Sequence, residues 1–426
     1  MARLDVRKTY ALVTSLSWLF AVLPMPVMVL LAQSRGISLT EIGVVMALYS
    51  VTVAALEVPS GALADTLGRK RTFLLGGLLA IASRVAAVLA MDTAGFIVFA
   101  LLFGVSRALT SGTLEAWFVD ALQEEDASVD LQPALAAAGS FQLAGLAIGT
   151  LAGGALPDLF AGLSTEGLLT PLAMPMLASA AGQVVVLAVT AALVLERRAA
   201  NAKAAPRALA AHIRGALASA VRTPHLRLLL LAEMAVGATV AASENLWQPF
   251  FAGLPQQLFG GGTTAMGVIL AGSFGVGILG NVLATAVSSA LGGRHALVAA
   301  LFQVLQGGAF VALALSGGFL AAAALFWGTY LSRSAWGSPH QALYNREVGS
   351  RERSVMLSVS SLASFLGAAA GSVALGAVAD GSSIGTAWSV AGALVAVTAL
   401  LYVRFERLPR HEAGRAGAEV LVAEPG

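Results

Sequence analysis

Six charged side chains lie inside stretches of this sequence that are otherwise strongly apolar. They are Arg84, Arg107, Glu115, Glu233, Glu244 and Arg333. In an apolar environment an ionised side chain is costly unless it faces water, a polar ligand or a group of opposite charge. Two interpretations therefore stay open for each residue: a site that binds a proton or a polar ligand, or a permanent ion pair between helices.

The acids Glu233 and Glu244 are the candidates for reversible proton binding. On a helix their spacing of eleven residues puts them on one face, about 16 Å apart. Removal from water favours the protonated carboxyl group, so a Glu that alternates between wet and dry surroundings can load and release a proton near neutral pH. Histidines are not expected to assist, because all five map to the side of the membrane that carries the basic loops. They are His212, His225, His295, His340 and His411.

Two stripes of side chains could line a cavity. The first follows the i, i+3, i+4, i+7, i+8 spacing of one helical face. It consists of Arg107, Thr110, Ser111, Leu114 and Glu115. The second places two aromatic rings on one face, which suits an apolar or cationic ligand. It consists of Trp327, Tyr330 and Ser334, and Arg333 on the same helix is a separate candidate for the cavity. Packing against other helices or against lipid is the alternative for these aromatic side chains.

The elements that carry these residues are predicted to lie in a bilayer. Hydrophobic residues make up 58% of the 426 positions and charged residues only 11%, which would leave a water-soluble protein covered in apolar surface. The apolar runs lack the alternation of barrel strands, so we expect α-helices, which satisfy their backbone hydrogen bonds internally. The sequence has no cysteine, which excludes disulfides and thiolate metal ligands, and we expect no metal site.

Windows of about 20 apolar residues predict twelve membrane-spanning helices. They cover residues 10–31, 41–62, 72–91, 95–119, 134–156, 172–195, 226–251, 265–291, 296–315, 319–339, 355–379 and 384–403. The fold class expected is therefore an all-α membrane protein of two six-helix bundles. The bundles would comprise residues 1–195 and 226–404, joined by a cytoplasmic linker, 196–225, and followed by a cytoplasmic tail, 405–426. The first span is too long for a signal peptide and should remain as a helix.

The basic residues predict the orientation of these helices. Nearly all of the 25 Lys and Arg residues fall in segments that share one side if both termini lie on that side, and Arg35 is the exception in an opposite loop. Since basic loops stay in the cytoplasm, both termini should be cytoplasmic. The formal charge of +2 is spread over many loops, so it reflects topology and no nucleic-acid partner is expected.

A charged turn with two glycines connects the second and third predicted helices. It runs Gly61-Ala-Leu-Ala-Asp65-Thr-Leu-Gly68-Arg69-Lys70-Arg71, and we call it the motif loop. Gly61 and Gly68 would allow close helix approach and a tight turn. Asp65 would cap a helix end, with the three basic residues held beneath it. A degenerate copy at residues 288–295 occupies the matching turn of the second half, which indicates an internal duplication.

At this loop the sequence resembles the major facilitator superfamily, whose motif reads Gly-x-Leu-Ala-Asp-Arg-x-Gly-Arg-Lys. Residues 61–70 match it except that Thr66 replaces the first Arg, and the resemblance extends over residues 10–403. It implies that Asp65 helps to hold the two bundles together in the outward-facing state. It also implies that Arg69 pairs with an acid at the inner end of the fourth helix, where Asp120 stands. Glu57 lies one turn before Gly61 near the inner surface, so we expect it to join this network. A loop that only orients the chain is the alternative.

The fifth predicted helix carries a glycine series at Gly145, Gly149, Gly153 and Gly154. The series follows the spacing Gly-x-x-x-Gly-Pro-x-x-Gly-Gly of antiporters in that superfamily, with Thr150 in place of Pro. The resemblance implies an antiporter, whereas plain close packing of two helices would require the same small residues. The family also often has an Arg in the fourth helix that is linked to proton coupling, which implies this role for Arg107.

The resemblance implies a secondary active transporter that works by alternating access, through rocking of two bundles around a central site. We expect proton-coupled efflux of a lipophilic, drug-like small molecule, because the run from Glu57 to Asp65 resembles bacterial drug exporters. Proton-coupled uptake of a small nutrient is the alternative. A membrane sensor that does not transport is the candidate from a different class.

Enzymatic activity and a cofactor are not expected. The sequence lacks a Gly-x-x-x-x-Gly-Lys-Ser/Thr loop and a His-Glu-x-x-His site. The expected partners are a small-molecule substrate, protons and the lipid bilayer. We expect the chain to act as a monomer in a bacterial inner (plasma) membrane.

Overall fold

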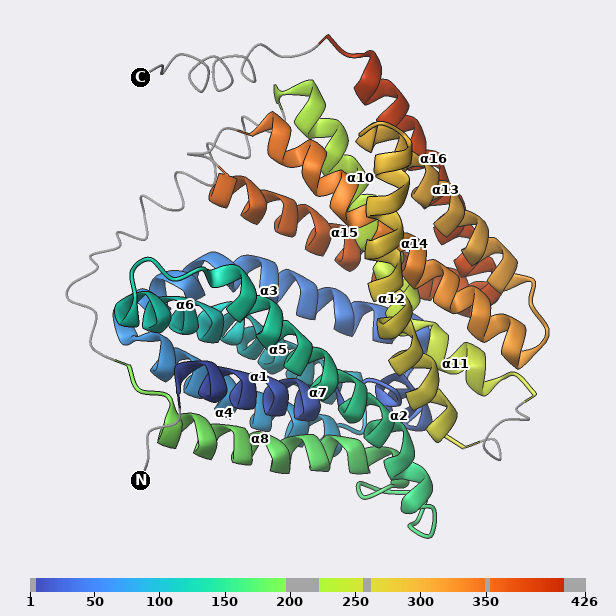
Figure 1. Cartoon of the computed structure of the whole chain (residues 1–426). Coiled ribbons are helices and arrows are strands. Elements are labelled where there is room, and N and C mark those ends of the chain that lie inside the picture. Colours follow the sequence, from blue (N-terminus) through green and yellow to red (C-terminus); the bar gives the residue numbers. More distant parts are fainter. Residues whose placement is uncertain (1–4, 197–221, 256–261, 349–352, 410–426) are drawn as a thin grey trace. The chain divides into compact units, whose positions relative to one another are not determined.

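The structure is all-helical where it is described. It is a computed structural model that describes residues 5–196, 222–255, 262–348 and 353–409 (Figure 1). These ranges contain α-helices, one short 3-10 helix and no strand. The predicted all-α class is therefore confirmed. Most of the predicted linker, 196–225, and the end of the predicted tail, 405–426, lie outside the described residues.

The helices gather into two compact units. The first unit combines the N-terminal helices with the segment Trp247–Ala271. Its complete helices are α1 (Val6–Val22), α2 (Met28–Ser34), α3 (Leu39–Leu67), α4 (Arg69–Leu89), α5 (Thr93–Thr110), α6 (Thr113–Glu125), α7 (Leu131–Leu159), η1 (Pro171–Ala173), α8 (Met174–Leu193) and α11 (Trp247–Ala252). The first turns of α12 (Thr264–Ala290) also belong to this unit.

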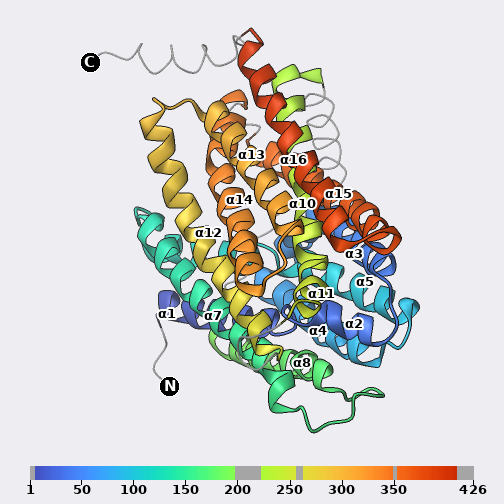
Figure 2. The ribbon, with the colours of Figure 1, turned by 90° about the vertical axis from the view of Figure 1, so that its right-hand side faces the viewer.

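The second unit contains α10 and the chain from Gly272 onward. Its helices are α10 (Pro224–Asn245), the remainder of α12, α13 (His295–Ala314), α14 (Phe319–Glu347), α15 (Arg353–Gly381) and α16 (Ile384–Arg407). Within this unit α13 packs against both α14 and α16, and α10 packs against α15 (Figure 2).

The same neighbour relations recur in the first unit. There α4 packs against both α5 and α8, and α1 packs against α7. Counted as membrane segments, the third therefore contacts the fourth and sixth, and the first contacts the fifth, in each half of the chain. This recurrence agrees with the internal duplication that the degenerate copy of the motif loop indicated.

The helices are long and apolar enough for a membrane protein. In the described residues, ten helical segments can cross a bilayer by length and composition. The α1–α2 pair and the charged α14 occupy the two remaining predicted spans, so the helix count is compatible with twelve. Outward-facing apolar side chains fit this setting, because lipid replaces water around them. Leu78, Ile148, Leu279 and Val282 are each more than half exposed.

Three of the predicted spans are broken helices, and the seventh, 226–251, divides into α10 and α11 at Leu246. The first span ends as α1 at Val22 and resumes as α2 at Met28, with Pro24 and Pro26 between them, because proline removes a backbone donor and clashes with the preceding turn. The fourth span was predicted as one helix over 95–119, and this was wrong. It divides into α5 and α6 at Gly112, whose φ of 66° is a left-handed conformation that favours glycine.

Backbone groups freed by the first break find a partner far along the chain. The buried side chain of Gln248, on α11, accepts a hydrogen bond from the Val29 N–H at 2.8 Å and donates one to the Met25 carbonyl at 2.9 Å. Unpaired backbone groups are costly inside a bilayer, so this amide stabilises the broken segment. It also joins α2 to α11 within the first unit.

Candidate functional site

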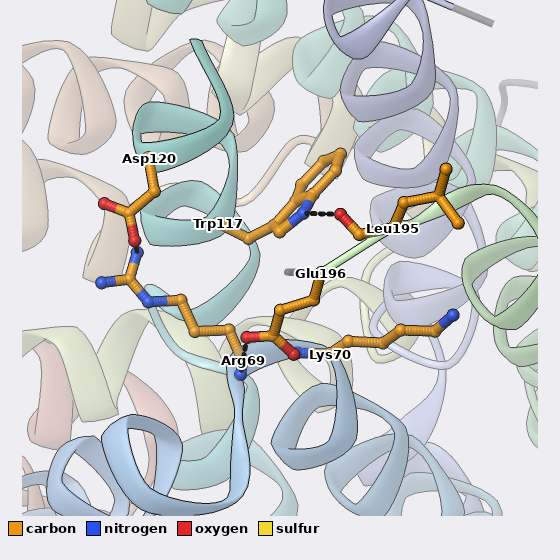
Figure 3. Close-up of polar contacts among 6 residues, drawn as sticks. All are labelled: Arg69, Lys70, Trp117, Asp120, Leu195 and Glu196. Carbon is orange, nitrogen blue, oxygen red and sulfur yellow. Dashed lines mark hydrogen bonds and ion pairs between the residues drawn. The ribbon is translucent and has the colours of Figure 1, made fainter. Parts of the chain in front are cut away.

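The motif loop forms the turn between α3 and α4. Gly68 ends α3 and precedes α4 with φ 95° and ψ 147°, a conformation that strains any residue with a Cβ. From the first turn of α4, Arg69 reaches α6, where its Nη1 lies 2.7 Å from Oδ2 of Asp120 (Figure 3). The structure thus brings together the two residues that the resemblance paired.

An acid that the sequence analysis did not single out binds the same turn. Glu196 lies just after α8, and its carboxylate accepts hydrogen bonds from the backbone N–H of Arg69 at 2.5 Å and of Lys70 at 3.1 Å (Figure 3). A carboxylate at a helix N-terminus satisfies free N–H groups and interacts favourably with the helix dipole. Glu196 was assigned to the linker, and the only sequence signal was an acid directly after an apolar span.

The residues before Glu196 are tied to the turn as well. The Trp117 Nε1–H of α6 donates to the Leu195 carbonyl at 3.0 Å, and Lys70 Nζ donates to the Ala191 carbonyl at 2.7 Å. The end of the sixth predicted span, α6 and the start of α4 therefore form one polar cluster around the motif loop (Figure 3).

The other motif residues are placed differently from the expectation. Asp65 lies exposed in the last turn of α3, and among the described residues it caps no helix, because Glu196 takes that position at α4. A methyl group on Gly61 would meet no atom within 4 Å, so close helix approach does not explain this glycine here. Glu57 is half-buried two turns before Asp65, and Arg71 is exposed.

The glycine series of α7 packs against two helices. A Cβ on Gly145, Gly149 or Gly153 would collide with backbone carbonyls of the α1 segment. Those carbonyls belong to Ser15, Leu19 and Leu23. Gly154 meets the backbone of Gly267 on α12 within the same unit. The series thus provides the close packing that the alternative interpretation required.

The position that departs from the antiporter pattern keeps α7 regular. The Thr150 hydroxyl donates to the Leu146 carbonyl at 2.6 Å inside an unbroken helix, where a proline would lack its own N–H donor.

In the second unit, two glycines of α15 make close contacts like those of the α7 glycines. A Cβ on Gly367 or Gly371 would collide with the backbone of Met234 or Ala238 on α10.

The predicted stripe from Arg107 to Glu115 does not exist as one helical face. Arg107 is half-buried in the last turn of α5, where its positive charge interacts favourably with the helix dipole. Glu115 is exposed in the first turn of α6, after the break at Gly112, and interacts electrostatically with Tyr10 of α1. The two charges therefore belong to different helices.

Glu233 does have a histidine partner, and the expectation to the contrary was wrong. Oε2 of Glu233 on α10 lies 3.1 Å from Nε2 of His340 on α14. The span predicted over 319–339 ended one residue before this histidine, whereas α14 continues to Glu347. His340 is accordingly a buried residue of the bundle and not a loop residue.

Glu244 has different surroundings, toward the other end of α10. It interacts electrostatically with Arg333 of α14, and the Tyr330 hydroxyl lies in the field of both charges. Trp327 stands one turn before Tyr330, and a Cβ on Gly272 of α12 would collide with its indole. Four of the predicted cavity residues are therefore gathered within the second unit, whereas Glu233 belongs to a separate cluster.

A membrane protein of two helical bundles, with recurring helix pairs and a charged turn after its second segment, is built as a membrane transporter. The chain belongs to the Major Facilitator Superfamily, which matches residues 10–346. This confirms the family resemblance stated from the motif loop. No curated protein matches the sequence.

Three solved structures illustrate the fold. The nucleoside transporter NupG has a TM-score of 0.76 and 13% identity, covering 95% of this chain and 100% of that one. A POT family transporter in complex with 5-aminolevulinic acid has a TM-score of 0.71 and 13% identity, covering 94% of this chain and 96% of that one. A bacterial homolog of the human lysosomal transporter Spinster, inward-facing and unoccupied, has a TM-score of 0.68 and 14% identity, covering 94% of each chain. At these identities the likeness demonstrates the fold alone.

Proposed function

We propose that this transporter couples proton movement to the efflux of lipophilic, drug-like small molecules by alternating access. The observation that carries the proposal is the cluster on α10 and α14, where Glu244 interacts with Arg333 and Tyr330, with Trp327 one turn away. A carboxylate within a transporter bundle can exchange a proton when its access to water changes. Aromatic rings beside it favour an apolar or cationic substrate.

The motif loop supplies the conformational part of the proposal. We assign the Arg69–Asp120 ion pair and the Glu196 contacts to one state of the transport cycle, with Asp65 and Glu57 engaging in another state. The glycines of α7 would allow close packing against α1 while helices change partners. The loop is assigned to the cytoplasmic side of a bacterial inner membrane, with both termini on that side.

The test is a transport assay in proteoliposomes with an imposed pH gradient. Ethidium serves as a lipophilic cation, and a trapped pH-sensitive dye reports protons. The proposal expects ethidium to accumulate against its gradient while the pH gradient dissipates, and expects Glu244→Gln to lose this coupling. The matched control is Glu406→Gln, because Glu406 is a surface acid that pairs with Arg294 at 3.7 Å.

The outcomes separate the candidate functions. Movement of ethidium together with protons, in the same direction, would favour uptake by symport over efflux. Wild-type protein that moves neither ethidium nor protons would contradict the proposed efflux, and a sensor without transport activity would then explain the chain better. Glu244→Gln with wild-type coupling would remove the cluster from the mechanism while leaving transport itself intact.

A further inference from the structure

We propose that the buried pair His340 and Glu233, held by Tyr402 and Trp336, binds the exchangeable proton of this transporter. The inference rests on the proposed proton coupling and moves its centre from the Glu244 cluster to a second site. That site joins three helices of the second unit, because α10 packs against both α14 and α16.

Hydrogen bonds join Trp336, Tyr402 and His340, and an ion-pair contact extends this chain to Glu233. Trp336 Nε1 donates to the Tyr402 hydroxyl at 2.7 Å, and this hydroxyl lies 2.8 Å from Nδ1 of His340. On the other edge of the ring, Nε2 of His340 lies 3.1 Å from the Glu233 carboxylate. Neither His340 Nε2 nor Glu233 Oε2 has a hydrogen-bond partner in the described residues. Each atom therefore depends on the other for its polar interaction.

The chemistry of the donors defines two states. Because indole N–H can only donate, the Tyr402 oxygen accepts from Trp336, and the Tyr402 O–H can donate a hydrogen bond to His340 Nδ1. His340 is then neutral, with its hydrogen on Nε2, the ring edge that contacts ionised Glu233. When the ring gains a proton, Nδ1 becomes a donor to the Tyr402 oxygen, the Tyr402 hydrogen turns away, and Nε2–H stays beside Glu233. One proton is thus gained without breaking the contact with the carboxylate.

Charge favours uptake of that proton. With neutral His340 and ionised Glu233 the buried pair carries one negative charge, whereas one added proton makes the pair neutral overall. The titratable neighbours are the phenols Tyr344 on α14 and Tyr402 on α16, both within the field of Glu233. Elsewhere in this unit, Gln303 of α13 accepts a hydrogen bond from Thr398, and the Met356 carbonyl of α15 accepts one from Tyr344. In the described residues His340 is the one basic group at ion-pair distance from Glu233.

Access to water differs between the two partners. The His340 side chain is 1% exposed and that of Glu233 is 14% exposed. Glu233 is thus the more accessible partner, and in the proposed cycle a change in the surroundings of α10 would control proton exchange without moving His340. Histidine suits this role because its unperturbed titration falls near physiological pH.

The chain contains a reporter for this proton. The Trp336 ring stacks on His340, with centroids 4.5 Å apart and 28° between the planes, and an imidazolium quenches indole fluorescence more strongly than a neutral imidazole. The experiment is a pH titration of fluorescence on the full chain in detergent, taken as the difference between wild type and Trp336→Phe. The expected result is a one-proton loss of fluorescence as pH falls. It should vanish in His340→Asn and persist in the control His295→Asn.

Glu233→Gln provides the second measurement. Without the carboxylate the proton should bind about tenfold more weakly or worse, which moves the step down by one pH unit or more. A step that survives in His340→Asn, or one that Glu233→Gln leaves in place, would overturn the proposal. If both His340→Asn and His340→Gln fail to give monodisperse protein, the proposal is tested by the pH shift of the fluorescence step in Glu233→Gln alone.

The titration needs no substrate, so it can fail separately from the proposed function. A wild-type protein that titrates as expected but moves no ethidium would retain the proton site and lose the efflux proposal. Conversely, gradient-driven transport that is undiminished in His340→Asn would remove this pair from coupling even if its titration behaves as expected.

Discussion

At the scale of single residues, the motif loop is bound by two acids with different tasks. Asp120 meets the side chain of Arg69, and Glu196 meets the backbone at the start of α4. The Asp120 side chain is 54% exposed, so solvent screens this ion pair and it should contribute less than about 1 kcal/mol. The contact made by Glu196 replaces a helix cap, which makes it the more important of the two for stability.

Replacing the capping acid should therefore destabilise the loop. We expect Glu196→Ala to lower the free energy of unfolding by about 1 kcal/mol, because two N–H groups of α4 lose their acceptor. Glu196→Gln keeps one oxygen as an acceptor and should cost less. The measurement is the apparent unfolding temperature in detergent, with the exposed acid Glu124→Ala as the control. Equal temperatures for Glu196→Ala and the control would show that the contact contributes nothing.

Asp65 should respond in the opposite way. It is an acid in the last turn of α3, where the helix dipole is unfavourable for a negative charge. We expect Asp65→Asn to keep or slightly raise thermal stability while it reduces gradient-driven transport, because the proposed partner of Asp65 belongs to another state of the cycle. Transport at the wild-type rate in this variant would show that Asp65 has no part in gating.

At the scale of helices, close approach and helix breaks explain most of the particular residue choices. Pro24 and Pro26 explain the break between α1 and α2. Nothing local indicated that Gln248, more than two hundred positions later, would satisfy the freed backbone groups. The break at Gly112 was equally hidden, because the apolar run continues through it. Periodicity predicts a helix and its face, whereas the partner of a broken end depends on the folded neighbours.

Gln248 gives a direct test of this interaction. Gln248→Leu has a similar size but leaves the Val29 N–H and the Met25 carbonyl without a partner, so we expect a loss of about 2 kcal/mol in stability. Gln33→Leu on α2 is the matched control, because Gln33 is only half-buried. Thermal unfolding of the purified variants checks the difference, and similar unfolding temperatures would contradict the stabilising role of the amide.

Two glycines on α7 offer a matched pair. We expect Gly149→Ala to destabilise the protein by about 1 to 3 kcal/mol, because the new methyl group collides with the Leu19 carbonyl and α1 must shift. Gly139→Ala places the same methyl group in open space on the same helix and should stabilise by about 0.5 kcal/mol. Unfolding temperatures that move in the same direction for both variants would mean that helix propensity, and not packing, dominates.

At the scale of the whole molecule, composition and motif spacing were sufficient for the class, the helical segments and the family. The apolar windows located the helices because a bilayer imposes their length. The site was less predictable. Arg69 and Asp120 could be paired through the family resemblance, but Glu196 and His340 became visible only when distant segments were brought together. Such contacts depend on tertiary structure, which a single sequence does not encode as a local pattern.

The division of the chain is also a property of the whole molecule. The proposed boundary near residue 226 remains a prediction, while the compact units divide within α12, between Ala271 and Gly272. The segment Trp247–Ala271 thus belongs with the N-terminal helices through contacts such as those of Gln248 and of Asp158, which accepts from Thr263 and Thr264. Sequence order alone assigned this segment to the other half.

The left-handed turn at Gly68 has a consequence for random mutagenesis. Any side chain there would strain the backbone and also collide with the Glu196 carboxylate, whereas a side chain at Gly61 meets open space. In a library selected for folded protein at the membrane, codons for other amino acids should be depleted at position 68 and retained at position 61. The two glycines of one motif would then differ strongly in their tolerance of substitution.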